Sequence, residues 1–91
     1  MKYDVIRTAK FRKELKKVLK RGADVAKLET VVSILASGET LPPQYHDHAL
    51  TGNLAGLRDC HIENDWLLLY TIQDDVLVLT LTRTGSHSDL F

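Results

Sequence analysis

The fold is decided by residues 57–91, LRDCHIENDWLLLYTIQDDVLVLTLTRTGSHSDLF. Runs of apolar and β-branched side chains predict three strands, at Leu57–Ile62, Trp66–Ile72 and Val76–Thr84. Between them, Asn64–Asp65 and Asp74–Asp75 are residue pairs suited to tight hairpin turns. The stretch is therefore expected to form an antiparallel meander followed by a histidine-bearing tail.

Two-residue turns would also fix how the strands pair. They place Glu63 opposite Trp66, Ile62 opposite Leu67, His61 opposite Leu68, Leu68 opposite Leu81, and Trp66 opposite Arg83. Because side chains alternate along a strand, one face is then expected to carry Asp59, His61, Trp66, Leu68, Tyr70, Leu79, Leu81 and Arg83. His61, Trp66 and Arg83 would meet at one end of the sheet. A slip of one residue in either hairpin would separate them.

One strand and two helices are predicted ahead of the meander. Lys2–Arg7 alternates as a strand, and Thr8 is suited to cap a helix over Ala9–Arg21 that ends at Gly22. A second helix, Val25–Ser37, can be capped by Asp24 and packs antiparallel to the first after a short turn. The fold class is thus α+β, with an N-terminal strand, a two-helix hairpin and a three-stranded meander, the helices backing a twisted sheet.

Length and composition indicate one soluble domain over residues 1–91. The chain is 44% hydrophobic and 26% charged, and it lacks an apolar run of the roughly 18 residues that a membrane span needs. Its basic, polar start does not resemble a signal peptide. The single cysteine, Cys60, argues against a disulfide framework and fits a reducing compartment. We therefore expect a cytoplasmic protein with no membrane partner.

Positive charge is concentrated in the first third of a chain whose net charge is zero. Residues 1–27 hold ten Lys and Arg against three acids, whereas residues 28–91 hold two against nine. Five lysines lie on the polar side of the first predicted helix: Lys10, Lys13, Lys16, Lys17 and Lys20. Such a face can attract nucleic acid. The alternative is an ordinary solvated helix surface.

Four histidines carry the possible chemistry. His46 and His48 lie in a long segment, residues 39–56, that Pro42 and Pro43 keep from being helical; His61 and His87 lie in the meander and the tail. Imidazole has an unperturbed pKa of about 6.5, which suits proton transfer near neutral pH. With Asp65 and Arg83, these histidines supply what a metal-free ribonuclease needs: a base for the ribose 2′-hydroxyl, a cation for the phosphate and an acid for the leaving 5′-oxygen.

Several other interpretations use the same residues. Trp66, Tyr70 and Phe91 could stack unpaired bases, although Trp66 could equally be a packing residue. A zinc site built from His46, His48, His61 or His87 and Asp65 is disfavoured, because no cysteine pair or HExxH-type spacing accompanies them. Catalysis by Cys60 is disfavoured because that residue alternates onto an apolar face.

Three motifs are similar to those of a known family. They are D-H-x-L-x-G at residues 47–52, R-D-x-H-I-x-x-D-W at residues 58–66 and R-T-G-S-H-S-x-L-F at residues 83–91. In this order, and across essentially the whole chain, they resemble the YafQ branch of the RelE/ParE toxin superfamily. The resemblance implies a RelE-like fold and a type II toxin that enters the ribosomal A site. There it would cut messenger RNA by 2′-hydroxyl attack, without a metal or other cofactor.

The resemblance also assigns roles to residues. His48, His61, Asp65 and His87 match the acid–base positions, with His87 the candidate general acid, and the base is left open. Arg83 matches the phosphate-stabilising arginine, and Trp66 and Phe91 match residues that hold the RNA. His46 matches no motif position. Because members of the family are usually basic and this chain is neutral, the five lysines of the first helix would supply most of the ribosome contacts.

Partners follow from the same resemblance. It implies a DinJ/RelB-like antitoxin, in a complex of two toxins with two antitoxins, that wraps the toxin and binds operator DNA. The 70S ribosome and its messenger RNA would be the target. The alternative function is that of a ParE-like inhibitor, which binds a DNA topoisomerase and does no chemistry. Such an inhibitor would not need the set of histidines.

Overall fold

The computed structural model describes residues 2–91 and has the predicted α+β fold. The first part of the chain forms β1 (Asp4–Arg7), α1 (Ala9–Lys20) and α2 (Val25–Ala36). The long segment contains two 3₁₀ turns, η1 (Pro43–Tyr45) and η2 (Gly52–Leu54), with the short strand β2 (His48–Ala49) between them. The rest forms β3 (Arg58–Glu63), β4 (Trp66–Gln73), β5 (Val78–Gly85) and α3 (His87–Leu90).

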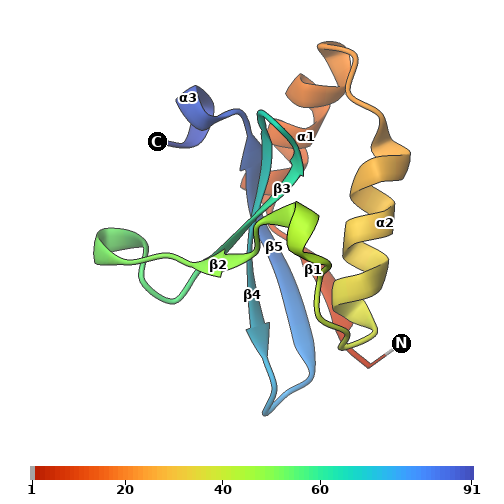
Figure 1. Ribbon diagram of the computed structural model, residues 1–91, viewed down its shortest axis with the longest axis vertical. Helices are drawn as coiled ribbons and strands as arrows, with labels where there is room; N and C mark the ends of the chain where they lie inside the picture. Colours follow the sequence, from red (N-terminus) through yellow and green to blue (C-terminus); the bar gives the residue numbers. More distant parts are fainter. Residues whose placement is uncertain (1) are drawn as a thin grey trace.

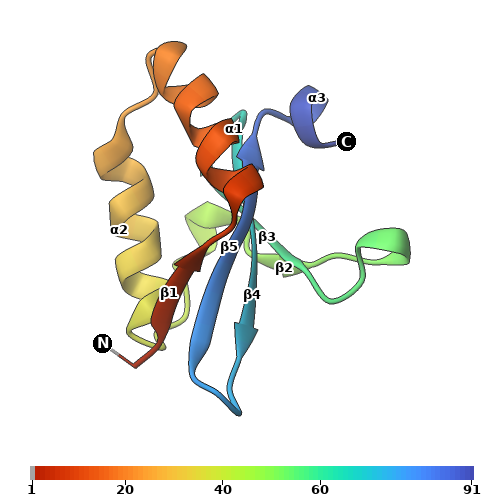
Figure 2. The ribbon, with the colours of Figure 1, turned by 180° about the vertical axis from the view of Figure 1, so that it is seen from behind.

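The strands form one sheet in the order β1-β5-β4-β3-β2 (Figure 1). β1 runs parallel to β5, and the other neighbours are antiparallel. α1 and α2 cover one side of the sheet, whereas α3 and the β2–β3 connection lie on the other (Figures 1 and 2). We call these the helix face and the open face. Within residues 2–91, no helix is long and apolar enough to cross a membrane.

The caps predicted for the two helices are present. The Thr8 hydroxyl accepts a hydrogen bond from the Phe11 N–H at 3.0 Å, and the Asp24 carboxylate accepts one from the Ala26 N–H at 3.0 Å. Gly22 follows α1 with a φ of +98°, a left-handed conformation that glycine adopts without a Cβ clash. Capping and stop signals therefore set the ends of α1 and α2 close to where the sequence predicts them.

Each face of the sheet has an apolar core. The main core lies between the sheet and the two helices and includes the fully buried Phe11, Val31, Leu68 and Leu81. A smaller one on the open face consists of Leu67, Leu69 and Leu90, with Leu50 and Leu57 packed against them. Leu90 belongs to α3, so the tail covers part of the open face. This second core explains why β4 is apolar on both faces.

The predicted strand register is wrong in both hairpins. Glu63 does pair with Trp66, but His61 lies opposite Leu67, and Arg83 lies opposite Leu69. The cause is two β-bulges. One lies between His61 and Glu63 in the β3–β4 pair, and the other lies between Leu69 and Tyr70 in the β4–β5 pair. Each places an extra residue in one strand, which reverses the alternation of side chains beyond it.

These bulges divide the predicted common face in two. Trp66, Leu68, Tyr70, Leu79 and Leu81 pack in the main core on the helix face. Asp59, His61 and Arg83 belong instead to the open face, since Asp59 and Arg83 both lie opposite Leu69 and His61 lies opposite Leu67. The second hairpin turn is also longer than predicted, because β5 begins at Val78 rather than Val76.

Candidate active site

Asp47 ties the long segment to the sheet. Its carboxylate accepts hydrogen bonds from the Arg58 guanidinium, at 3.0 Å from Nη2 and 3.3 Å from Nε, and from the Tyr70 hydroxyl. Arg58 and Tyr70 lie opposite each other on β3 and β4. Burial and the Asp47 carboxylate raise the pKa of Tyr70, so its hydroxyl remains a donor. Asp47 thereby holds the next residue, His48, at the start of β2.

His48 is oriented from both ring nitrogens. Its Nδ1 lies 2.8 Å from the carbonyl oxygen of His46, and because a carbonyl only accepts, Nδ1 carries a proton. Its Nε2 lies 3.6 Å from Oδ2 of Asp59, the residue that it faces across the β2–β3 pair. In the neutral ring, Nε2 is therefore unprotonated and can accept a proton.

His61 lies between two other histidines. The centres of the His46 and His61 rings are 5.3 Å apart, and those of the His61 and His87 rings are 5.4 Å apart. His46 adopts a left-handed backbone conformation, with φ of +49°. Although it matches no family motif position, the fold thus brings its ring to the edge of the cluster. We use "histidine cluster" for His46, His48, His61 and His87.

The short helix α3 positions His87. Ser86 and Asp89 cap the helix reciprocally, the Ser86 N–H donating to the Asp89 carboxylate at 3.0 Å and the Asp89 N–H to the Ser86 hydroxyl at 3.2 Å. Arg21 at the end of α1 binds the same carboxylate, with Nη1 2.7 Å from Oδ2. These bonds lower the pKa of Asp89. Asp65 in the β3–β4 turn completes the arrangement by accepting hydrogen bonds from the backbone N–H and from Nδ1 of His87.

Arg83 is held by Glu14 of α1. Its Nη2 lies 2.7 Å and its Nε 3.3 Å from the two carboxylate oxygens, and the Glu14 carboxylate also accepts the Thr84 N–H at 3.3 Å. The pair is partly buried, with side chains 24% and 17% exposed. Arg83 thus comes from the same face of the sheet as His61, but its guanidinium is paired with a carboxylate.

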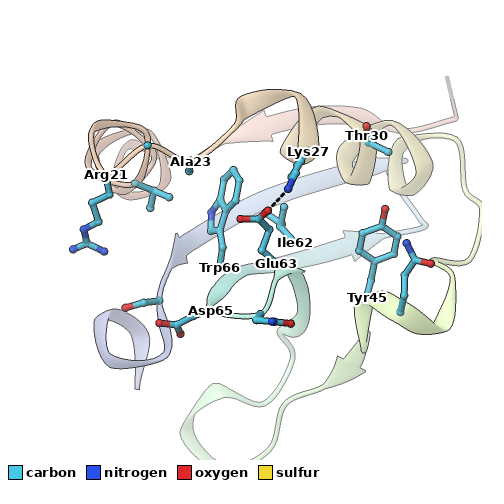
Figure 3. A pocket seen from close by; sticks show the side chains of 14 residues that line it. Arg21, Ala23, Lys27, Thr30, Tyr45, Ile62, Glu63, Asp65 and Trp66 are labelled. Carbon is cyan, nitrogen blue, oxygen red and sulfur yellow. Dashed lines mark hydrogen bonds and ion pairs between the residues drawn. The ribbon is translucent and has the colours of Figure 1, made fainter.

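Trp66 does not join the histidine cluster. It is 4% exposed on the helix face, and its Nε1–H donates to the Thr84 hydroxyl at 2.9 Å. It lines a cavity of about 840 Å³ between the α1–α2 turn and the β3–β4 turn (Figure 3). Lys27 and Glu63 form an ion pair on the wall of this cavity, as Figure 3 shows. The geometry favours the packing interpretation of Trp66.

The remaining predicted residues differ in their exposure to solvent. Phe91 is 59% exposed after α3. The five lysines of α1 are all exposed: Lys10, Lys13, Lys16, Lys17 and Lys20. Cys60 is fully buried, which raises the pKa of its thiol, so it is not a candidate nucleophile. Among residues 2–91, no group of three or more His, Cys, Asp or Glu side chains is arranged to hold a metal ion.

Sequence reasoning missed the roles of three acidic residues that shape this site. Asp59 faces His48, Asp47 anchors the loop to Arg58 and Tyr70, and Glu14 holds Arg83. Asp59 had a recognisable signal, since it is a charged residue within a predicted strand. The role of Glu14 had no such signal, because it depends on where α1 meets β5 in space.

Comparisons with known proteins show the family and the overall fold. Residues 3–91 match the family described as bacterial toxin of type II toxin-antitoxin system, YafQ. The mRNA interferase toxin YafQ of Escherichia coli K12 is 37% identical over 89 residues, which cover 97% of this chain and 95% of that protein. The crystal structure of YafQ from E. coli BL21(DE3) has a TM-score of 0.91 at 36% identity and covers 98% of both chains. The E. coli DinJ–YafQ complex gives 0.88 at 37% identity, with the same coverage.

Proposed function

The chain belongs to the YafQ family of bacterial type II toxins, and we propose that it cuts messenger RNA in the A site of the ribosome. Its relatives are mRNA interferases, which favours an endoribonuclease over the ParE-like inhibitor of a topoisomerase. The observation that carries the proposal is the histidine cluster beside α3. There His87 has its Nδ1 bonded to Asp65, which leaves Nε2 to exchange a proton with a ligand.

The proposed reaction is a metal-free acid–base cleavage. His48 or His61 takes the proton from a ribose 2′-hydroxyl, and the 2′-oxygen forms a bond to the adjacent phosphorus. The bond from phosphorus to the 5′-oxygen breaks, and His87 in its imidazolium form, with a proton on each ring nitrogen, gives its Nε2 proton to that oxygen. The products are a 2′,3′-cyclic phosphate and a 5′-hydroxyl. Each proton transfer of this kind typically contributes about 10²- to 10⁴-fold.

Asp65, Arg83, Phe91 and Trp66 support this reaction in different ways. Asp65 fixes the His87 tautomer, and Arg83 neutralises the phosphate after exchanging Glu14 for the substrate. Phe91 is exposed next to α3, where its ring can stack on a base of the message. Trp66 acts indirectly, because its hydrogen bond to Thr84 ties β4 to the strand that leads into α3.

Binding to the ribosome is assigned to α1. Its five lysines are exposed on a chain whose other charged residues carry a net negative charge, seven Lys and Arg against twelve Asp and Glu, so ribosomal RNA should be held mainly by this helix. A ribosomal target implies that the protein acts in the cytoplasm. The partner that restrains it is a DinJ-type antitoxin, in keeping with the E. coli complex. We propose a complex of two toxins and two antitoxins that binds operator DNA through the antitoxin.

The decisive experiment maps cut sites on a translated message with and without ribosomes. We expect cuts within codons that occupy the A site, with 2′,3′-cyclic phosphate ends, and no cuts at the same positions in naked RNA. Cleavage of naked RNA at those positions would refute the ribosome requirement. Halted replication with continued translation after induction would instead favour the ParE-like alternative.

A further inference from the structure

Asp59 is a buried carboxylate with an unmet hydrogen-bonding requirement. The residue is 4% exposed near the start of β3, and within residues 2–91 its Oδ1 is the only buried side-chain nitrogen or oxygen without a hydrogen-bond partner. A charged group buried in this way costs stability unless a cation or donors compensate for it. Because this carboxylate lies beside the histidine cluster, we look for its role in the chemistry of the site.

The groups around Asp59 are histidines, which carry a positive charge only when protonated. Its Oδ2 lies 3.6 Å from Nε2 of His48. Burial raises the pKa of Asp59; His48, His61 and His87 act in the opposite direction, and Asp47 adds to the effect of burial. The three histidines that act on this carboxylate therefore come from three different elements, β2, β3 and α3.

The tautomer of His48 decides what Asp59 can do. Because the His46 carbonyl oxygen binds the protonated Nδ1 at 2.8 Å, the neutral ring turns an unprotonated Nε2 towards the carboxylate. In that state two acceptors face each other and no hydrogen bond forms between them. Once Nε2 gains a proton, it becomes a donor with a carboxylate in front of it. The interaction is thus weak before proton transfer and strong after it.

We propose that Asp59 is a positioning residue that stabilises the His48 imidazolium formed when Nε2 accepts the ribose 2′-hydroxyl proton. The inference rests on the proposed function, and it selects His48 over His61 as the general base. The proton leaves the 2′-oxygen as that oxygen bonds to phosphorus, and the new N–H is attracted by Asp59 Oδ2. An interaction that strengthens during the reaction lowers the barrier, whereas one of constant strength would not.

A double-mutant cycle tests the coupling on translating ribosomes. Asp59→Asn keeps the shape of the side chain and removes its charge, and we expect kcat to fall about 10- to 100-fold, which is part of the 10²- to 10⁴-fold worth of a general base. In a His48→Ala background, the same change should have little further effect. Asp74→Asn, which makes the same substitution in the β4–β5 turn, is the matched control and should leave cleavage unchanged. Full activity of Asp59→Asn, or a loss that simply multiplies with that of His48→Ala, would overturn the proposal.

Two further readouts separate this role from a structural one. Asp59→Asn should unfold at the same or a higher temperature, because it removes an incompletely hydrogen-bonded buried charge, whereas a structural residue would lose stability and activity together. By carboxyl ¹³C NMR, Asp59 should titrate at higher pH in His48→Ala than in the parent protein. An unchanged titration would overturn the coupling even if Asp59→Asn failed to fold. If the parent protein does not cut ribosome-bound message, the proposed function fails, and the NMR comparison alone decides the role of Asp59.

Discussion

Asp65 holds His87 by two hydrogen bonds to one carboxylate oxygen, from the backbone N–H at 2.9 Å and from Nδ1 at 2.8 Å. These bonds lower the pKa of Asp65, so the carboxylate remains charged wherever an imidazole titrates. The bonded Nδ1 keeps its proton, and Nε2 is the nitrogen that can pass one to a substrate. A turn of the sheet and a helix of one turn thereby define the tautomer of a single histidine.

His87→Ala is expected to remove the general acid while leaving the fold intact, because the side chain is exposed. Cleavage of ribosome-bound message should fall by about 10²- to 10⁴-fold, and growth arrest on expression in bacteria should be relieved. Asp65→Asn should lose less, since the amide still offers an acceptor oxygen to Nδ1. Ser88→Ala, a change on the same helix, serves as the control. A fully toxic His87→Ala protein would contradict the assignment of the acid.

The anchor of α3 gives a pH-dependent contribution to stability. Asp89 binds Arg21 and the Ser86 N–H, and these bonds hold its pKa below the ordinary value of 3.8. Because the carboxyl pKa is lower in the folded chain than in the unfolded one, the contribution is complete above about pH 4 and declines as pH falls through the depressed pKa. Asp89→Asn should therefore be less stable than the parent at pH 7, and this difference should shrink below pH 4. Urea unfolding at several pH values measures it, with Asp75→Asn as a control; a constant difference would contradict the mechanism.

Much of the fold could be predicted because local signals determine it. Thr8, Asp24 and Gly22 act within a few residues of where they stand, and the helix ends follow from them. The register could not be predicted, because a bulge next to His61 has no local signature and depends on how β3 and β4 pack. One extra residue there was enough to move His61 to the face opposite Trp66.

The roles predicted for the site residues remain predictions, but their positions can be compared with the structure. The motifs containing His61 and His87 predict acid–base residues, and the fold brings these two rings within 5.4 Å between ring centres. The motifs cannot indicate that Asp59 faces His48, since that contact requires β2, which lies in a segment without periodicity. They also cannot indicate that the guanidinium of Arg83 already forms an ion pair with Glu14.

Glu14 is expected to compete with the substrate for Arg83. Glu14→Gln keeps an oxygen for the Thr84 N–H but weakens the hold on the guanidinium, so more of the arginine is available to a phosphate. Ion pairs of this kind are worth about 0.2–1 kcal/mol when partly solvated, which predicts a gain of up to about fivefold in kcat/KM. Single-turnover cleavage with saturating and limiting ribosomes measures this. A loss of activity at unchanged melting temperature would mean that Glu14 orients Arg83 for the reaction instead.

The lysines of α1 are expected to determine ribosome affinity without affecting chemistry. Replacing Lys13, Lys16 and Lys17 by Gln should weaken binding to 70S ribosomes. It should also reduce the slope of log K against log salt by about one for each lysine that contacts a phosphate. Single-turnover cleavage at saturating ribosomes should stay near the parent rate, since α3 and the histidine cluster are unchanged. Lys27→Gln makes the same kind of substitution at a lysine already paired with Glu63, and it should leave the salt slope unaltered. If the triple variant binds with the parent slope, ribosome recognition must lie on another surface of the toxin.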